Sequence, residues 1–344
     1  MALIKKSSIM ETLLKQCVGI DISKLTFTAC VCRKFITGKQ EFSNVETFTN
    51  NKKGFNQLIK WSRKITRPGL LPVVFLMEAT GVYYESLAYR LHMLELPVCV
   101  LLPNKVNHYA KSLNVKTKTD AVDARIISQM GIEQSHSLWT PSSPIYKELK
   151  QMTRYYSALK KEHSQISNHL EALLCGERPS SFVSNSYKKL LSDIEKETER
   201  CVQAIRKLIA EDPVLSAKIE KLETIKGVGF ITIVIVIAET QGFELVSSRK
   251  QLASYAGFDV VERQSGTSIK GRTRISKKGN SRIRAALYFP AMISSMHNPV
   301  FKEDYQRINE GKCCKKIGVT ALQRKLLLLI YTLWKNGETF KVST

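Results

Sequence analysis

Long apolar runs are scarce in this sequence. No run approaches the ~18–20 residues of a transmembrane helix, and the longest candidates, Val73–Met77 and Ile231–Ala238, have the length of core elements. The N-terminal stretch MALIKKSSIMETLLKQ lacks the apolar segment and small-residue cleavage site of a signal peptide. We therefore expect no membrane partner, and we predict that residues 1–16 form an extension, either a short extra helix or a tail.

Metal-binding patterns of cysteine and histidine are also lacking. The six histidines are scattered, and the eight cysteines stand at positions 17, 30, 32, 99, 175, 201, 313 and 314 without zinc-finger spacing. Cys30 and Cys32 fall on a strand-like run, which directs both side chains to the same face. The pattern favours reduced thiols in a cytoplasmic protein over a disulfide framework.

Acidic residues are few relative to basic ones. The 344 residues include 53 Lys and Arg against 30 Asp and Glu, a net charge of +23. Such an excess favours a polyanionic partner, most simply nucleic acid, because each cation docked on a phosphate releases counterions. The apolar fraction of 43% is ordinary for a globular protein, and the length allows two domains or one large one.

The first third of the chain alternates strand-like and helix-like segments. Residues 17–34 predict a strand, a tight turn and a returning strand, and a third strand follows at 40–48. Further along come a helix at 51–66, a buried strand at 71–80, a helix at 83–94 and a buried strand at 97–103. This order, with its continuous apolar runs, predicts a mixed sheet covered by helices.

The middle of the chain, from Ile145 to about Thr224, is charged and helical in period. A turn-rich connector at 176–186 divides it, which predicts an antiparallel helical hairpin or coiled coil that mediates self-association. The rest of the chain is again compact. It begins with a Gly-x-Gly turn and an apolar helix at 225–239, a weak indication of contact with a DNA backbone.

Asp120 and Asp123 lie three residues apart at the start of a predicted helix. One interpretation is structural: Asp120 caps the helix and Asp123 interacts with its dipole. The other depends on two more acids, Asp21 in the apolar strand GIDIS and Glu78 at the end of a buried strand. If those strands are neighbours, four carboxylates converge and require cations, which predicts Mg²⁺ or Mn²⁺ and phosphodiester chemistry.

A dense basic patch occupies residues 263–284. No acidic residue occurs between Arg263 and Lys302, and Gly, Ser and Thr are interleaved with the cations. A solvated basic face is the simplest explanation of any such run, but the hydroxyls favour phosphate contact. The predicted nucleic-acid contacts are Arg263, Lys270, Arg272, Arg274, Lys277, Lys278, Arg282 and Arg284, together with Lys116 and Lys118 near the acids.

Several motifs together resemble the DEDD transposases of insertion sequences, a family that includes the pilin-gene invertase and bridge-RNA-guided recombinases. They are GIDISK, MEATGVYYE, KTDAVDAR, ASYAGF and SGTSIKGRTRISKKGNSRIRAALY, and the match covers roughly 17–130 and 222–340. The resemblance implies an α/β RNase H-like (RuvC-type) catalytic domain at 17–142. A helical coiled-coil region at 143–222 and a mainly α C-terminal transposase domain at 223–344 follow.

The resemblance also implies site residues and partners. Asp21, Glu78, Asp120 and Asp123 match the four metal-binding acids, and Ser265 matches a serine that attacks a DNA phosphate and forms a phosphoserine link. Residue chemistry alone does not separate Ser265 from Ser268 or Ser276. The implied partners are donor and target DNA, a bridge-type guide RNA, and further copies of the chain in a homodimer or homotetramer.

Two rival hypotheses remain. One is a hydrolytic RNase H-like nuclease, resembling a Holliday-junction resolvase, in which the acids cut and Ser265 only binds. The other is an RNA-binding structural protein with a degenerate site, which the presence of all four acids disfavours. Tyr83 and Tyr84, which follow Glu78, either contact nucleic acid or pack at the start of a helix.

Overall fold

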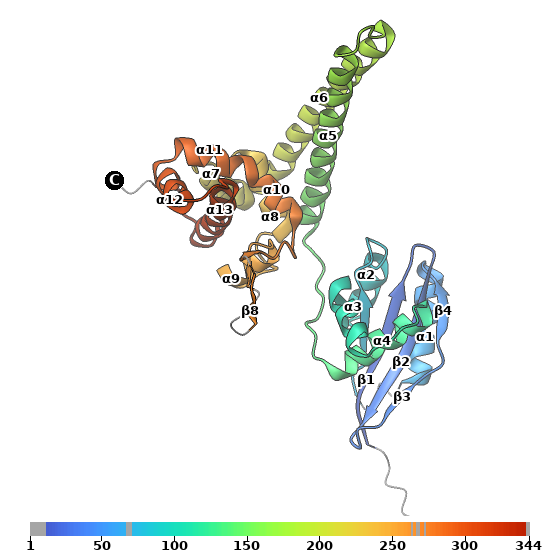
Figure 1. Cartoon of the computed structure of the whole chain (residues 1–344). Coiled ribbons are helices and arrows are strands. Elements are labelled where there is room, and N and C mark those ends of the chain that lie inside the picture. Colours follow the sequence, from blue (N-terminus) through green and yellow to red (C-terminus); the bar gives the residue numbers. More distant parts are fainter. Residues whose placement is uncertain (1–11, 67–70, 263, 266–268, 272, 342–344) are drawn as a thin grey trace, which may run out of the picture. The chain divides into compact units, whose positions relative to one another are not determined.

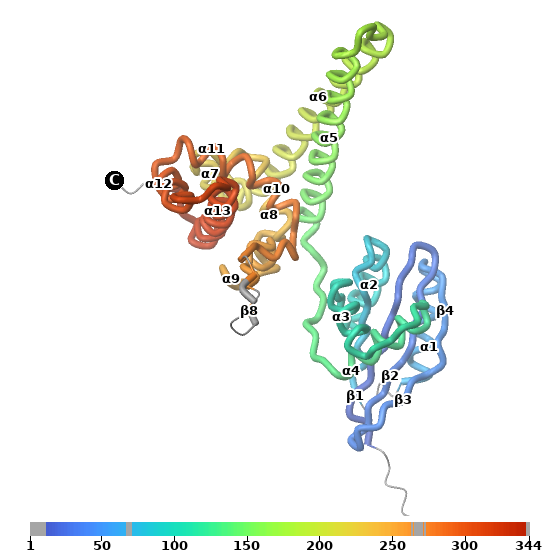
Figure 2. Tube along the Cα trace, viewed as in Figure 1, coloured from blue at the N-terminus to red at the C-terminus, as the bar shows by residue number. Residues whose placement is uncertain are grey.

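The structure is a computed structural model that describes residues 12–66, 71–262, 264–265, 269–271 and 273–341. The chain forms two compact units, Met1–Pro141 and Ser142–Thr344. Figure 1 shows a sheet with helices in the first unit and helices in most of the second, and Figure 2 follows the same path as a tube.

A mixed sheet forms the centre of the N-terminal unit. Its strands are β1 (Leu13–Ile22), β2 (Thr26–Phe35), β3 (Gln40–Phe42), β4 (Glu46–Thr49), β5 (Val74–Glu78) and β6 (Val98–Leu101). The order is β3-β2-β1-β5-β6, and β4 also pairs with β2. The β1–β2 pair is antiparallel, whereas β5 and β6 continue parallel to β1. The predicted mixed sheet is therefore confirmed, and it is compatible with an RNase H-like fold.

Helices cover both faces of this sheet: α1 (Lys52–Ile65), α2 (Glu85–Met93), α3 (Pro103–Ser112) and α4 (Asp120–Glu133). Successive side chains of a strand point to opposite faces. Ile20 and Ile22 accordingly join one buried cluster with residues of α1 and α2. Cys17 joins another with residues of α3 and α4. Asp21 has the same parity as Cys17, so it faces the α3–α4 layer.

Four expectations for this unit need correction. The first strand begins at Leu13, so residues 13–16 belong to the sheet rather than to an N-terminal extension. The single strand expected at 40–48 is two short strands, because Ser43–Val45 interrupt the pairing with β2. Helix α3 was not anticipated, since its polar sequence PNKVNHYAKS has little apolar periodicity. Asp120 does not cap α4, whose N-cap is Thr119.

A long antiparallel helical hairpin opens the second unit and projects from its helical body (Figure 1). Its helices are α5 (Pro144–Leu174) and α6 (Ser181–Ala210). The Tyr155 hydroxyl donates to Glu197 at 3.3 Å and the ring of His169 lies against Tyr187, as expected when the two helices run in opposite directions. The predicted hairpin is present. Its connector is shorter than expected, because α6 already begins at Ser181.

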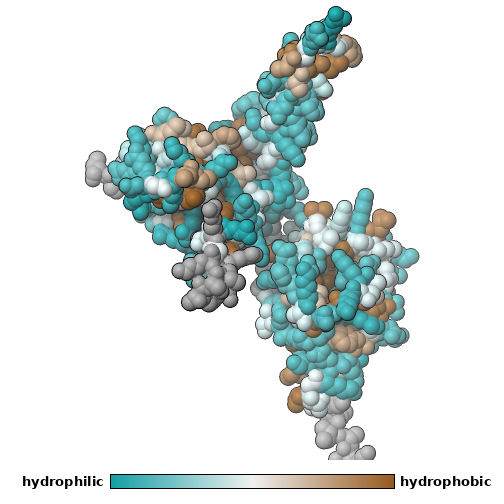
Figure 3. Space-filling model, in the orientation of Figure 1, coloured by the Kyte–Doolittle hydropathy of each residue, from teal (hydrophilic) through white to brown (hydrophobic). Residues whose placement is uncertain are grey.

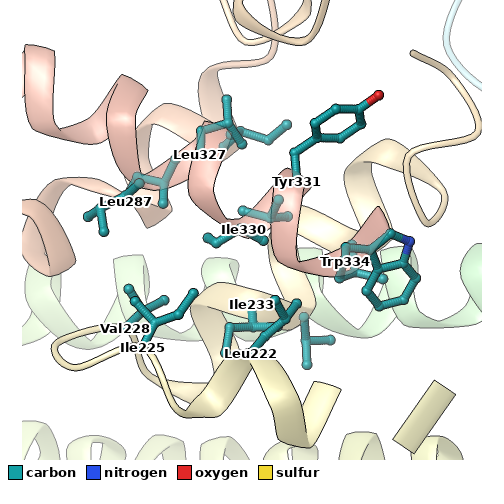
Figure 4. Packing of buried hydrophobic residues seen from close by; sticks show 14 of the residues in the cluster. Leu222, Ile225, Val228, Ile233, Leu287, Leu327, Ile330, Tyr331 and Trp334 are labelled. Carbon is teal, nitrogen blue, oxygen red and sulfur yellow. The ribbon is translucent and has the colours of Figure 1, made fainter. Parts of the chain in front are cut away.

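The body of the second unit is a helical bundle with small strand pairs. Its elements are α7 (Pro213–Glu223), α8 (Phe230–Thr240), α9 (Arg249–Tyr255), β7 (Val260–Val261), β8 (Gln264–Ser265), β9 (Ile269–Lys270), β10 (Arg274–Ile275), α10 (Ser281–Ala286), α11 (Tyr288–His297), α12 (Pro299–Asn309) and α13 (Lys316–Asn336). Figure 4 shows the core, where Leu222, Ile233 and Ile330 pack together. Asp212 and Pro213, which begin α7, divide the helical region predicted up to about Thr224 a second time.

Helix α13 is long and apolar enough to cross a membrane by length and composition alone. In the structure, half of its most apolar 18-residue window is buried. Leu322, Leu326 and Ile330 are fully buried in the core of the unit. Its hydropathy is therefore explained by packing inside a globular unit.

Candidate active site

Asp21 and Glu78 are neighbours at the carboxyl ends of adjacent parallel strands. In the β1–β5 pairing Ile20 lies opposite Met77, so the next residues along the strands are Asp21 and Glu78. Residues opposite each other on parallel strands direct their side chains to the same face. Both carboxylates are half-buried there. The sheet order therefore brings together two acids that are 57 residues apart in the sequence.

Helix α4 lies unusually close to β1. A Cβ on Gly19 would stand 2.1 Å from the backbone nitrogen of Ser128 and 2.5 Å from the carbonyl oxygen of Ala124, so only glycine permits this approach. Gly131 lies in the same way over Cys17. The helix thus runs opposite to β1. Asp123 lies ~7 Å before Ser128 along α4, and Asp21 lies ~7 Å beyond Gly19 along β1. Because the two elements run in opposite directions, these steps bring Asp123 close to Asp21.

The start of α4 is fixed by Thr119 rather than by an aspartate. The Thr119 hydroxyl accepts the backbone N–H of Val122 at 3.3 Å, and its carbonyl accepts the N–H of Asp123. Thr119 has the extended backbone conformation of an N-cap residue. The carboxylates of Asp120 and Asp123 therefore have no capping role, although the helix dipole still favours both in the first turn.

The electrostatics of Asp21 place the four acids in one cluster. Burial is the largest cause that raises the pKa of its carboxyl to about 6, followed by the charges of Asp123, Asp120 and Glu78. Lys118 opposes this rise. Burial also raises the pKa of Asp123, where Lys118 again acts in the opposite direction. The ends of β1 and β5 and the first turn of α4 therefore lie close enough for the charges of the other three acids to act on Asp21.

A cavity of 360 Å³ opens beside this cluster. Glu78 and Asp123 line one side of it, and Lys116 and Lys118 belong to its wall. Helix α3 supplies much of the rest, including Asn104, Asn107 and Lys111. The cavity combines two acids with exposed cations, which suits a phosphate-bearing ligand close to the carboxylates. The α3 residues were missed because that helix was not anticipated.

The donor set of this cluster suits a hard divalent cation. All four groups are carboxylates, the ligands that Mg²⁺ and Mn²⁺ prefer. Within the described ranges Asp21 has no hydrogen-bond or ion-pair partner, whereas Glu78 accepts the Thr80 hydroxyl at 3.1 Å. Over the same residues no three His, Cys, Asp or Glu side chains stand at metal-ligand spacing. The residue types fit a cation, while the side chains are spread more widely than bound ligands would be.

Ser265 lies on a small β-structure in the second unit. Strand β7 pairs antiparallel with β10, and β8 pairs antiparallel with β9. Ser265 ends β8 and stands opposite Ile269. Ser268 is outside the described residues. Ser276 is committed to structure, because its hydroxyl donates to Asp259 at 2.6 Å and accepts the N–H of Lys278. Ser276 is thus a poor candidate for the nucleophile.

Two family models match different parts of the chain. A DEDD-type family model described as a transposase matches residues 18–179, and one described as "Transposase IS116/IS110/IS902 family" matches residues 219–306. The chain is 33% identical over 335 residues to the pilin gene-inverting protein of Moraxella lacunata. The match covers 95% of this chain and 98% of the relative. The chain belongs to the IS116/IS110/IS902 family of transposases. The corresponding Moraxella bovis protein is 32% identical over the same shares of the two chains.

The family assignment confirms the resemblance read from the motifs and makes DNA recombination the activity of the protein. The first matched segment contains all four acids and ends inside the helical hairpin. The second contains Ser265 and the basic patch. Residues 180–218 fall in neither segment, which agrees with the weak motif content of this helical region.

The predicted basic contacts of this transposase have different environments. Arg274, Lys277 and Lys278 are exposed, as are Lys116 and Lys118 in the other unit. Arg263 and Arg272 lie outside the described residues, and Lys270 pairs with Gln264 through the backbone of β9. These positions leave the exposed cations free to meet phosphate.

Arg282 and Arg284 have protein partners. The guanidinium of Arg284 donates to the carbonyl oxygen of Ala256 at 2.7 Å, which ties α10 to the end of α9. Arg282 stands 3.9 Å from Glu239 and is half-exposed. Arg284 therefore helps to hold the scaffold beneath the basic patch.

Glu239 is a buried charge that the sequence reading missed. It is only 1% exposed, and its carboxylate accepts two bonds from Arg154, at 2.8 and 3.2 Å, and one from Asn280 at 2.8 Å. Burial alone would raise its pKa, but these donors lower it below the usual value. Asn280 also caps α10. The network joins the hairpin, α8 and the basic segment, and the missed signal was an acid inside the apolar run ITIVIVIAET.

The two tyrosines after Glu78 differ in environment. Tyr84 packs against the buried cluster of the sheet, and burial raises the pKa of its hydroxyl. Tyr83 is 41% exposed, and its carbonyl accepts a bond from Asn50 at 3.1 Å. The packing interpretation therefore holds for Tyr84, while Tyr83 remains accessible to a partner.

Proposed function

We propose that this transposase cleaves and exchanges DNA strands by using the four acids of its first unit together with Ser265 of its second. The observation that carries the proposal is the convergence of Asp21, Glu78, Asp120 and Asp123 from two strands and one helix. Burial of the Asp21 carboxyl, followed by repulsion from the other three acids, raises its pKa to about 6. In this proposal residues 17–142 form the RuvC-type catalytic domain, and residues 223–344 form the domain that supplies the serine.

A bound Mg²⁺ or Mn²⁺ would supply charge stabilisation at the phosphate oxygens and at the leaving oxygen. Asp21 and Glu78 on the sheet, with Asp120 and Asp123 on α4, would hold it. Lys116 and Lys118 line or border the adjacent cavity and would orient the DNA phosphate. The four acids therefore act by positioning charge, and no one of them is required as a covalent group.

The covalent step belongs to Ser265. Its hydroxyl oxygen bonds to the phosphorus of the scissile phosphate while the bond from phosphorus to the leaving sugar oxygen breaks. The serine proton ends on that leaving oxygen, so one phosphoserine ester replaces one phosphodiester. Attack by a second strand's sugar hydroxyl reverses the exchange and releases Ser265 with no net hydrolysis.

Sequence choice and assembly require partners. A guide RNA of the bridge type, paired with donor and target DNA, is consistent with the charge of +23, which exceeds what one short phosphate contact needs. Self-association as a homodimer or homotetramer is supported by the hairpin. Figure 3 shows hydrophilic residues along much of it and hydrophobic ones near its far end. There Phe182 is 79% and Leu174 50% exposed.

The decisive experiment is a search for a protein–DNA adduct. The protein is incubated with Mg²⁺, cognate RNA and DNA, and protease-sensitive retention of labelled DNA is measured. Ser265→Ala is expected to abolish the adduct, and the matched control Ser276→Ala should retain it if the fold survives. Asp21→Asn should abolish cleavage altogether.

Two outcomes would favour the rival activities. Full cleavage without an adduct in Ser265→Ala indicates a hydrolytic nuclease. The observation that supports this alternative is that all four acids belong to the first unit. Nucleic-acid binding that persists without any cleavage in the wild-type protein, under every metal tested, indicates a structural RNA-binding role.

A further inference from the structure

A second cavity, of 560 Å³, lies in the C-terminal unit between the β7–β10 strand pair and helices α12 and α13. Its volume falls in the range of ~300–1,000 Å³ typical of small-molecule sites. Two stretches far apart in the sequence, 258–275 and 308–325, build it. None of the groups assigned to the acid cluster or to the serine lines it.

The interior of this cavity is apolar. Phe258 forms part of its wall and is buried, and Ile275 of β10, Ile308 of α12 and Ile317 of α13 add aliphatic surface. Ala321, one turn along α13 from Ile317, leaves room because its side chain is small. A flat, apolar group such as a nucleobase is suited to these walls, because it buries apolar surface against them. A charged group alone would gain no such burial.

The rim of the cavity is cationic. Arg274, Lys316, Arg324 and Lys325 all belong to its lining, and none of the described lining residues is acidic. Lys325 is paired with Asp304, which also accepts from Arg307 at 2.9 Å. For the described part of the chain, the other three cations have no ion-pair partner. This rim is complementary to a phosphate.

We propose that this cavity binds one unpaired nucleotide, with its base among the aliphatic side chains and its phosphate at the basic rim. The base of a nucleotide matches the apolar interior, and its phosphate matches the cationic rim. A paired base remains stacked in its duplex and therefore cannot enter the cavity. Val260 of the cavity is five residues from Ser265, a chain distance of at most ~18 Å. This placement next to the reacting strand rests on the proposed function.

The binding test uses duplexes with a single unpaired 2-aminopurine, in DNA and in RNA form, and fully paired duplexes as reference. No divalent metal is added, so no strand chemistry contributes. Wild-type protein should bind the bulged duplex about tenfold more tightly than the paired one, the effect expected for one stacked base. The 2-aminopurine fluorescence should change on binding, and preference for the DNA or the RNA form identifies the strand.

Ala321→Phe fills the cavity without changing charge, and the matched control Ala158→Phe adds the same ring to an exposed position on α5. Ala321→Phe should abolish the tenfold preference and leave paired-duplex affinity within about twofold, whereas Ala158→Phe should keep both. Arg324→Ala, which creates no steric conflict, should weaken bulged-duplex binding more than paired-duplex binding. Circular dichroism confirms that each variant is folded.

The proposal is overturned if wild-type protein shows no preference for a bulge in either nucleic acid, or if folded Ala321→Phe and Arg324→Ala keep it unchanged. A change in oligomeric mass by light scattering in Ala321→Phe, with the preference intact, would assign the cavity to contact between copies of the chain and would also refute nucleotide binding. Because the assay reads binding alone, its failure is separate from absence of the Ser265 adduct.

Discussion

At the scale of single residues, Asp21 is an acid whose charged form is destabilised by its position in the fold. A carboxylate in a half-buried position, surrounded by three other acids, is less stable charged than it would be in water. The pKa of Asp21 rises from 3.8 to about 6 for this reason. The fold tolerates this cost because the adjacent residues Ile20 and Ile22 are buried in the apolar core.

The stability effect of this raised pKa has a definite sign. A carboxyl whose pKa is higher in the folded state favours folding when protonated, so its contribution is complete below pH ~4 and is lost as the pH rises through about 6. Asp21→Asn should therefore stabilise the metal-free first unit at pH 7 by ~1–2 kcal/mol, a value reduced for solvent screening, while abolishing cleavage. Hydrogen exchange of the β1 amides in the full chain measures the change.

The control for this prediction is Glu46→Gln, an exposed acid on β4 of the same sheet. It should leave β1 exchange unchanged. At pH 4.5 the difference between Asp21→Asn and wild type should shrink, because most of the wild-type carboxyl is then protonated. Faster β1 exchange in Asp21→Asn at pH 7 would contradict the electrostatic account.

At the scale of elements, the contact between α4 and β1 decides where Asp120 and Asp123 stand. Thr119 sets the first residue of the helix, and Gly19 sets how closely the helix approaches the sheet. Small residues on both elements, such as Cys17 opposite Gly131, keep this layer thin. A displacement of α4 would therefore separate the two aspartates from Asp21 and Glu78 without changing any acid.

Gly19→Ala tests this directly. The added Cβ would meet backbone atoms of Ser128 and Ala124 that cannot rotate away, so α4 must shift. We expect destabilisation of ~1–3 kcal/mol, the usual cost of overpacking, and a loss of cleavage at least tenfold larger than stability alone explains. Denaturant unfolding and a cleavage assay under fully folded conditions separate the two effects.

Gly229→Ala is a suitable comparison, because a Cβ there meets nothing within 4 Å. It should remain close to wild type in both assays. If Gly19→Ala cleaves normally, α4 is not held by this contact, and the spacing of the acids has another origin.

At the scale of the whole molecule, the hairpin of α5 and α6 presents apolar side chains that its own unit does not cover. Phe182 is 79% exposed, and Leu190 and Leu174 are about half-exposed. Exposed apolar groups gathered at the end of an extended element are typical of contact surfaces. Self-association through this end is consistent with the proposed homo-oligomer.

Phe182→Asp should weaken self-association by at least about tenfold, since burial of a phenylalanine contributes ~1.5–3 kcal/mol. Analytical ultracentrifugation over a range of concentrations measures this. Asn185→Asp adds the same charge at an exposed position of the same helix and should have little effect. An unchanged association constant in Phe182→Asp would place the contact elsewhere.

Much of the fold followed from local pattern. The alternation of apolar and polar residues predicted the hairpin of β1 and β2, the crossover helices and the long α5–α6 pair, because periodicity reflects burial directly. Boundaries were less well predicted. Helix α3 has a weak apolar pattern, and Ser181 begins α6 inside a stretch rich in Ser that resembles a connector.

The sequence by itself indicated the candidate residues for the proposed chemistry: two acids in apolar strands, two at the start of a helix, a serine beside a basic run, and motifs shared with a transposase family. These are local choices of residue type, and they are readable because a buried carboxylate is too costly to occur without a reason. The tertiary structure alone decided that β1 and β5 are adjacent, that Gly19 admits α4, and that Glu239 links three segments. These facts depend on contacts between residues far apart in the chain, and no local pattern records which distant backbone lies within van der Waals distance.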